Sequence, residues 1–386
     1  MQPKILDAES LKDWIKHKGT NAALQFILPF VEGKSRALIE NVEAEVKLLL
    51  LDEVFMPLVF GNEAFQERNS FVCSPMAHYV HYAKIELDVE MADKTLLIAF
   101  AKPFLNLLGN LGRFCQFEKV VYINNWLLTT NLYPTLTAED YEKIKCFLLK
   151  QYPDRALVFR SVNVLLNQSV FESLLSLGFK PVLSRQVYIT DVRDGNFRQN
   201  SNYKKDLKLK RKLSFYEWED LKSPVSAEDL TRIHTLYRKL YIAKYSVYNP
   251  DLSPEYILNS LKSGFLSCHI LRNRQESNRI DAVIGYYARE GVMTTPFAGY
   301  DLEQPKAYGL YRLLTLKITE ESEKQKLILN RSSGASGYKR LRGAKPVMEY
   351  NMVFDQHLSW RRRLIWRVFR GLSKYIVIPI MQKMGL

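Results

Sequence analysis

The sequence predicts an α/β (α+β) protein whose two similar halves each form a mixed, mostly antiparallel sheet flanked by helices. Residues 46–191 alternate short apolar runs with helical patterns and end in two closely spaced strands. Residues 225–354 read as two helices, three strands joined by short turns, a helix, a strand, a short helix and a closing strand. The 386 residues, 47% of them hydrophobic, are enough for a core in each half.

The net charge of +14 is concentrated in two segments. Residues 198–213 hold seven basic side chains and one acidic, and residues 358–386 hold seven basic and none acidic. Two basic patches on a nearly neutral body indicate contact with an anionic partner, which leaves phosphate-bearing ligands, membrane lipid and nucleic acid open. Nucleic acid is the least favoured, because the sequence contains no recognised DNA- or RNA-binding motif.

The cysteines and the N-terminus indicate a cytoplasmic location. Cys73, Cys115, Cys146 and Cys268 are far apart and form no CxxC pair, which argues against a zinc site and a disulfide scaffold and favours free thiols. The first ten residues lack the apolar region of a secretory signal. No stretch reaches the roughly 18 apolar residues of a membrane span.

The start of the chain gives weak local signals. Residues 1–45 are expected to form an irregular helical segment, and 46–51 either end a helix or form a buried strand. Residues 71–82 read as extended, and they contain His78 and His81. On an extended segment these two histidines would face opposite sides, so ordinary structural histidines are favoured over a metal pair.

The rest of the first half follows from caps and apolar runs. Thr137 is expected to cap a helix that ends near Lys150, with Glu139 and Asp140 in its first turn. Gly178 is expected to end a second helix. This second helix is expected at residues 168–177. Strands are expected at 119–123, 156–160 and 186–190.

The second half follows a linker helix at 198–213, which is either solvated or a helix that contacts phosphates. Ser226 and Ser253 are expected helix caps. Strands at 265–271, 279–288 and 292–300 should be antiparallel neighbours. The loop 303–311 then leads into a helix at 310–324, and a helix preceded by a strand and loop can bind an anion through its free N–H groups.

The chain is organised around residues 327–354, which read as strand, tight loop, short helical turn, loop and strand. Small residues at 332–337 permit a sharp reversal, and Lys339, Arg340 and Arg342 lie beside it. A small-residue hinge with clustered cations between two strands favours an anion-handling site. The alternative is a structural turn with solvated charges.

This order of elements resembles the Gcn5-related N-acyltransferase superfamily. Its usual loop pattern is Gln/Arg-x-x-Gly-x-Gly/Ala, and this chain has Gln304-Pro305-Lys306-Ala307-Tyr308-Gly309-Leu310, with one glycine where two are expected. The basic block between two α/β halves, Tyr338-Lys339 after a Gly/Ser turn, and Glu349-Tyr350 on the closing strand resemble the tandem group of Fem peptidyl transferases and BioF2-like proteins. The resemblance covers roughly 46–355.

The resemblance implies two tandem acyltransferase-like folds. The implied segments are an N-terminal helical segment (1–45), a first domain (46–195), a basic linker helix (196–224), a second domain that binds the acyl donor (225–357) and a basic amphipathic tail (358–386). The donor would be a thioester of coenzyme A or acyl carrier protein, or an aminoacyl-tRNA. The acceptor would be an amine on a small or lipid-linked molecule, and no metal is implied.

The implied site follows from what acyl transfer requires. Donor binding falls to the loop residues Gln304, Lys306, Tyr308, Gly309 and Leu310, together with Phe297 and Ala298, whose strand has backbone N–H groups that can hold the carbonyl. Glu349 is the expected base, directly or through water. Tyr338 or Tyr350 is expected to protonate the leaving thiolate, Lys339 to handle charge, and Asp301 is a reserve candidate.

The tail 358–386 predicts an amphipathic helix. Arg363, Arg367, Arg370 and Lys374 fall on one stripe, and a broad apolar side lies opposite, made of Leu364, Ile365, Val368, Phe369 and Leu372. This pattern indicates an interfacial anchor on an anionic membrane at its inner face. The alternative is a C-terminal helix packed on the body.

An N-acyltransferase is therefore the first functional hypothesis. The second is a catalytically inactive module of the same fold that binds a ligand or a membrane, because the donor loop departs from the usual pattern. Nucleic-acid binding through 198–213 is the third.

Overall fold

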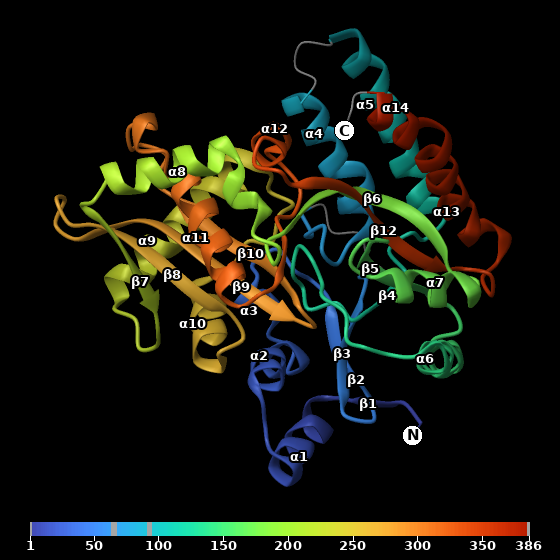
Figure 1. Ribbon diagram of the computed structural model, residues 1–386. Helices are drawn as coiled ribbons and strands as arrows, with labels where there is room; N and C mark the ends of the chain where they lie inside the picture. Colours follow the sequence, from blue (N-terminus) through green and yellow to red (C-terminus); the bar gives the residue numbers. More distant parts are fainter. Residues whose placement is uncertain (1, 63–67, 91–94, 384–386) are drawn as a thin grey trace.

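The computed structural model describes residues 2–62, 68–90 and 95–383, and within them twelve strands join into one sheet (Figure 1). The strands are β1 (Lys4–Leu6), β2 (Glu45–Leu51), β3 (Val54–Phe60), β4 (Val120–Ile123), β5 (Ala156–Val162), β6 (Lys180–Asp191), β7 (Tyr216–Leu221), β8 (Ser267–Asn273), β9 (Arg279–Arg289), β10 (Val292–Tyr300), β11 (Ile328–Asn330) and β12 (Lys345–Phe354). Neighbours pair antiparallel except β4 with β5 and β10 with β11, so the predicted mixed, mostly antiparallel α/β fold is confirmed.

Helices cover both faces of this sheet. They are α1 (Ala8–Lys18), α2 (Ala22–Val31), α3 (Ser35–Leu38), α4 (Ala83–Glu90), α5 (Thr95–Phe114), α6 (Ala138–Gln151), α7 (Gln168–Ser176), α8 (Ser201–Lys212), α9 (Ala227–Arg238), α10 (Pro254–Ser263), α11 (Leu310–Lys324), α12 (Ser336–Arg340), α13 (Trp360–Leu372) and α14 (Ile378–Lys383). Short π-helical segments occur at Ala77–Tyr82, Lys239–Tyr245 and Ser373–Val377.

The order of strands is β1-β2-β3-β4-β5-β12-β6-β11-β10-β9-β8-β7. The closing strand β12, which follows the second half in sequence, lies between β5 and β6 of the first half and pairs antiparallel with both. Strand β6 in turn pairs with β11. The sheet therefore runs without a break from one half to the other, and the junction is made by strands that come from both.

Alternating side chains divide the apolar residues between the two faces. On β2, Leu48 and Leu50 belong to one core and Leu49 and Leu51 to another, as the period of two along a strand requires. On β9, Val283 packs with α9, whereas Ala282 and Ile284 pack with α11.

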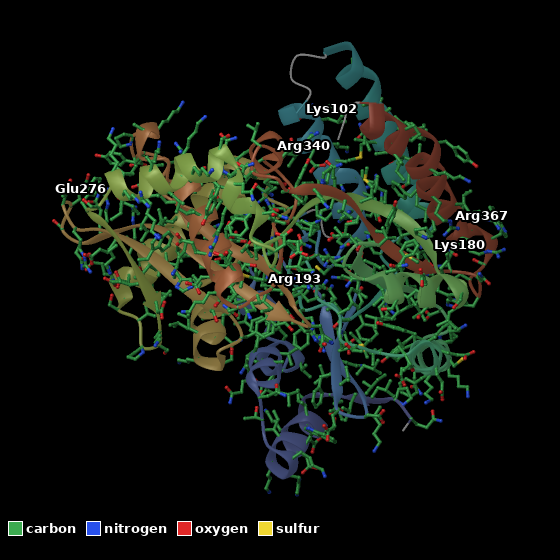
Figure 2. All side chains as sticks on the ribbon, viewed as in Figure 1. Lys102, Lys180, Arg193, Glu276, Arg340 and Arg367 are labelled. Carbon is green, nitrogen blue, oxygen red and sulfur yellow. The ribbon has the colours of Figure 1, made fainter. Side chains whose placement is uncertain are left out.

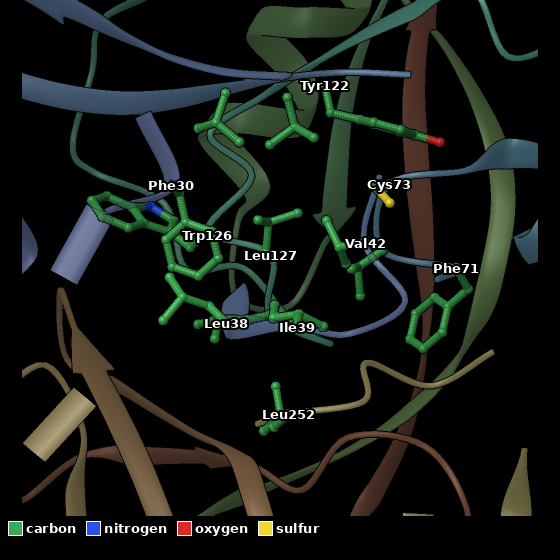
Figure 3. Packing of buried hydrophobic residues seen from close by; sticks show 14 of the residues in the cluster. Phe30, Leu38, Ile39, Val42, Phe71, Cys73, Tyr122, Trp126, Leu127 and Leu252 are labelled. Atoms are coloured by element: carbon green, nitrogen blue, oxygen red, sulfur yellow. The ribbon is translucent and has the colours of Figure 1, made fainter. Parts of the chain in front are cut away.

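The largest core crosses between the halves. Leu252, which precedes α10, packs with Leu38 and Ile39 from the N-terminal segment (Figure 3). A single β-bridge also joins Ile39 to Leu252. The N-terminal segment therefore packs against the second half as well as the first.

Local sequence signals placed many elements correctly. Thr137, Ser226 and Ser253 cap α6, α9 and α10 as predicted, and Gly264 ends α10 in the left-handed conformation. The three strands β8, β9 and β10 are antiparallel neighbours, as expected. The stretch 327–354 forms β11, α12 and β12.

Three local expectations were wrong, open or missing. Residues 71–82 are helical rather than extended from Pro75 onward, because this segment packs as a helix under Phe117 and Phe369 through Tyr79. Residues 46–51, left open between helix and strand, form β2. Strand β7 was not predicted, since its charged residues conceal an edge strand that pairs with β8.

Candidate functional site

A central cavity lies where the two halves meet. Its volume free of protein atoms is about 1360 Å³, and part of this volume is continuous with solvent. Its wall combines the first-half residues His78 and Arg185 with the second-half residues Tyr241, Tyr311 and Arg331. Ser332–Ala335, which belong to the small-residue turn predicted at 332–337, also line it. The cavity is therefore the place where the two halves can act on one ligand.

The cavity lies where strands β10 and β11 separate. These parallel strands pair from Val292 to Thr294, opposite Ile328 to Asn330, and β11 ends there. A register shift in β10 between Thr294 and Phe297 marks a bulge at the same point. Ala298 and Tyr300, beyond the bulge, line the cavity.

The bulge leaves two backbone N–H groups of β10 facing this opening. The Asp301 N–H donates to the Asp281 carbonyl on β9 at 2.8 Å. Since N–H directions alternate along a strand, the N–H groups of Tyr300 and Ala298 point to the opposite side, where β11 has ended. In the part of the chain that the structure describes, no strand pairs with Ala298 on that side.

Glu349 is held by Arg185 behind the cavity wall. Its side chain is 1% exposed, and its Oε1 accepts from Arg185 Nε at 2.8 Å. Arg185 also donates to the Thr129 carbonyl and to Thr130 Oγ1, at 2.6 and 2.8 Å. Arg185 lines the cavity, so Glu349 is connected to it through this guanidinium. Glu349 Oε2 accepts no hydrogen bond from the described residues.

Lys339 holds the small-residue turn in place. Its Nζ donates to the carbonyls of Arg331, Ser332 and Ser333, at 2.6, 3.1 and 2.6 Å. Burial, followed by the charges of Arg331 and Arg185, lowers the pKa of Lys339 well below its usual value. The predicted charge-handling lysine therefore lies at the cavity, with its donors directed to backbone.

Two further cations lie in or behind this wall. Arg331 donates to Thr190 Oγ1 and Thr319 Oγ1, both at 2.8 Å, and loss of solvent lowers its pKa to about 10. Arg160 is 3% exposed and donates to Asn125 Oδ1 at 3.0 Å. Within the described residues, none of Arg160, Arg331 and Lys339 forms an ion pair with a carboxylate, and the buried carboxylate of Glu349 is paired with Arg185.

The two predicted tyrosines lie in different places. The Tyr338 hydroxyl is 2.5 Å from Thr315 Oγ1, which lines the cavity, and the Arg342 guanidinium stacks on the Tyr338 ring. Tyr350 packs on Phe171, within the core on the other face of the sheet. The structure thus brings Tyr338 next to the cavity wall and leaves Tyr350 away from it.

The predicted donor loop 303–311 reaches the cavity wall only through Tyr311, and its other residues lie beside the cavity. Its residues Lys306–Tyr308 form a 3-10 turn, Lys306 is exposed, and Tyr308 packs on Phe215 and Tyr216. Leu310 is buried in the core under α11, and Gln304 is half-buried. In contrast, Ala298 lines the cavity, while the Phe297 ring is buried against Tyr237.

Gly309 is the residue of this loop that the fold requires. Its φ of +54° is left-handed, and an added Cβ would lie 2.9 Å from Leu209 Cδ2 of α8. The basic linker helix α8 therefore lies across the start of α11. Arg312 and Arg342 both donate to Asp206 on α8, which fixes this arrangement. The reserve candidate Asp301 pairs with Arg232 at 2.7 Å.

His78 is a cavity residue that the sequence did not single out as functional. Its Nε2 lies 3.3 Å from Ser184 Oγ, and burial, followed by the charges of Arg160 and Arg185, lowers its pKa to about 3. It is therefore neutral at neutral pH. Arg185, in the middle of strand β6, was also missed.

Replacing His78 by glutamine is expected to reduce the loss of stability in acid. A free histidine takes up a proton near pH 6.5, whereas buried His78 does not until about pH 3, so the unfolded state gains stability as pH falls through this window. Relative to wild type, the variant should gain about 2 kcal/mol between pH 7 and pH 5. Urea unfolding of the wild type and the variant at both pH values measures this. If the difference in unfolding free energy between the two proteins were the same at pH 7 and pH 5, the prediction would be contradicted.

Among the described residues, no three His, Cys, Asp or Glu side chains lie together as a metal site would require. The described cysteines are all free, and Cys146 is exposed while the other three are buried.

Comparison with known proteins supplies the fold and no closer relationship. No protein-family model matches the chain, and no curated protein matches it. Among solved structures, FemX matches with a TM-score of 0.52 at 8% identity, over 96% of this chain and 100% of that one. L-PGS from Bacillus licheniformis has a TM-score of 0.48 at 11% identity, over 95% of this chain and 98% of that one.

These identities are too low to show more than a shared fold. Of the two structures, FemX is the one whose TM-score exceeds 0.5. Its match extends over nearly the whole chain, including both halves and the strands that join them. The chain therefore has the fold of FemX, and the predicted resemblance to the Fem group is confirmed for the fold alone.

Proposed function

We propose that this protein is an N-acyltransferase that moves an acyl group from a thioester donor, acyl-CoA or acyl carrier protein, to an amine acceptor. The observation that carries the proposal is the opening between β10 and β11, where the N–H groups of Ala298 and Tyr300 face a cavity shared by both halves. Such N–H groups can hold a thioester carbonyl and stabilise the oxyanion that forms on it.

The proposed reaction is direct transfer. The amine nitrogen attacks the thioester carbonyl carbon, the C–N bond forms, and the C–S bond breaks with release of a thiolate. The amine proton passes to Glu349 through water, and Tyr338 returns a proton to the thiolate. Glu349 also orients Arg185 at the cavity, and Lys339 fixes the turn 332–335 that closes one side of it.

The acceptor or donor bound here is proposed to carry a negative group near the reacting atoms. Arg331 lines the cavity and forms no ion pair with a carboxylate among the described residues. A carboxylate or phosphate on the substrate would supply that partner and remove the cost of isolated charge. A lipid-linked or natural-product amine with such a group fits this requirement.

Long- and short-chain acyl-CoA should stabilise the protein against heat, and filling the cavity should remove this effect. Thr295 lines the cavity, so the ring of Thr295→Phe would occupy space that the donor needs. Thr20→Phe, in an exposed position, is the matched control and should keep the shift. Thermal-shift and native mass spectrometry measurements with an acyl-CoA series, against free coenzyme A, test both variants.

The outcomes separate the two leading hypotheses. A chain-length-dependent shift that Thr295→Phe removes supports a thioester donor in this cavity, and turnover of an amine then distinguishes an enzyme from an inactive binding module. Equal shifts in both variants would place donor binding elsewhere, with the loop 303–311 next to be tested. No shift across the series would count against coenzyme A and leave carrier-protein or aminoacyl-tRNA donors.

A further inference from the structure

Helix α5 and the tail segment α13–α14 form one exposed apolar face. The two run side by side along one border of the molecule (Figure 1), and the Arg361 guanidinium lies 5.3 Å from the centre of the Phe114 ring between them. Among the described residues, eight of the fifteen strongly exposed large apolar side chains belong to this pair: Phe104, Leu107, Phe114, Trp360, Tyr375, Ile376, Val377 and Ile380. Leu107 is 63% exposed and Tyr375 71%.

This face differs from the one that the sequence predicted. Ile365 and Phe369, expected on the lipid-facing side of a tail helix, are buried with Trp366 against Phe117. Arg362 is also buried and donates to the Lys119 carbonyl at 3.0 Å. Helix α13 is therefore packed on the body through its apolar side, and the apolar groups left in solvent come from α5, from Trp360 at the start of α13 and from residues after Leu372. Residues 384–386 of the predicted tail lie outside the described residues.

The charge on this face has one sign. Neither Thr95–Phe114 nor 358–386 contains an aspartate or glutamate. Lys102 pairs with Asp88 and Arg370 with Asp355, each from outside these segments. The remaining cations that have no carboxylate partner in the described part of the chain are Arg113, Arg361, Arg363, Arg367 and Lys374. Lys102 and Arg367 lie at this border of the molecule (Figure 2).

We infer that this face docks on an anionic lipid surface. Exposed aromatic and aliphatic side chains among unpaired cations fit the boundary between acyl chains and acidic headgroups. A second copy of this chain fits less well, since it would bring two sets of cations together. No helix among the described residues has the length and apolar character to cross a bilayer. Contact would therefore be interfacial, through side chains already exposed.

The docked face lies one helix away from the cavity. Glu86 of α4 lines the cavity, and α4 packs on α5. Docking through α5 and α13 therefore places the cavity close to the lipid surface, within reach of an acceptor held in that surface. The inference itself stands on the exposed face and does not require the proposed acyl transfer.

Co-sedimentation with vesicles tests this docking surface. The full chain should bind vesicles of phosphatidylcholine that contain a quarter phosphatidylglycerol, and bind pure phosphatidylcholine much more weakly. Arg367→Gln/Lys374→Gln removes two exposed cations of the face and should weaken binding about 30-fold, at roughly 1 kcal/mol per cation. The matched control, Lys204→Gln/Lys205→Gln, removes two exposed cations of α8 and should leave binding unchanged.

The apolar part has its own pair of variants. Leu107→Ser/Ile376→Ser/Ile380→Ser should abolish binding, because it removes the groups that enter the interface. Val164→Ser/Leu165→Ser/Leu175→Ser changes three similarly exposed side chains elsewhere and should bind normally. Equal binding by both triple variants would overturn the inference. So would a light-scattering mass showing that the first triple variant breaks a dimer of the wild-type chain, since the face would then join two copies.

Discussion

Replacing Asp206 by alanine is expected to lower the free energy of unfolding by about 3–5 kcal/mol. Asp206 is 2% exposed on the linker helix α8, and it accepts from Arg312 Nε at 2.6 Å and from Arg342 Nε and Nη2 at 2.6 and 2.9 Å. Without its carboxylate, two guanidinium groups from α11 and from the segment after α12 would face each other with no anion between them.

Lys210→Met is the matched control for this prediction. Lys210 lies on the same helix and pairs with Glu320 at 2.8 Å, but its side chain is 42% exposed, so its loss should cost less than about 1 kcal/mol. Urea unfolding of both variants gives the comparison. If the two variants lost the same amount, the buried cluster would not be what fixes α8 to the second half.

Replacing Glu349 by methionine is expected to have a similar effect, again about 3–5 kcal/mol, because it leaves Arg185 without its carboxylate in a place that is 15% exposed. The double variant Glu349→Met/Arg185→Met should recover most of that loss, since a buried ion pair can often be replaced by apolar side chains at little cost. Chemical unfolding of the two single variants and the double variant measures the coupling.

The same variants separate stability from function. Under the proposed reaction, the double variant should be stable and yet inactive, because it lacks both the cavity guanidinium and the proposed base. If it kept full turnover, the Arg185–Glu349 pair would be structural only and the proposed proton acceptor would lie elsewhere. If it remained as unstable as Glu349→Met, the pair would depend on the neighbouring contacts of Arg185 to Thr129 and Thr130 rather than on charge.

Local signals in the sequence were sufficient for the capped helices and for the neighbouring strands β8, β9 and β10, and insufficient for the order of strands in the sheet. Thr137, Ser226 and Ser253 act within one helical turn, so their caps can be recognised from neighbouring residues. The position of β12 depends on β5 and β6, and nothing within Lys345–Phe354 specifies these partners. The burial pattern of the second half of β12 is one that any central strand covered on both faces of the sheet would show.

The residues of the cavity were predicted only in part, again because the local sequence does not show which distant segments meet. The small-residue turn at 332–335 and Lys339 were singled out from sequence, and both lie at the cavity. What the turn contacts was not visible, because the lysine reaches back to carbonyls six to eight residues earlier. Arg185 and His78 come from the first half, and only the folded sheet brings them opposite Arg331 and Tyr311.

The insertion of β12 between β5 and β6 also has a consequence for biosynthesis. Tyr350 pairs with Val162, 188 positions earlier in the chain, so the first half of the sheet lacks a central strand while the second half of the chain is still being made on the ribosome. Until residue 354 has emerged, β5 and β6 each have an open edge, and such edges are prone to pair with other chains. Folding of the first half is therefore expected to finish only after nearly the whole chain has been translated. Although the first half is synthesised early, it should depend on chaperones until the closing strand has emerged.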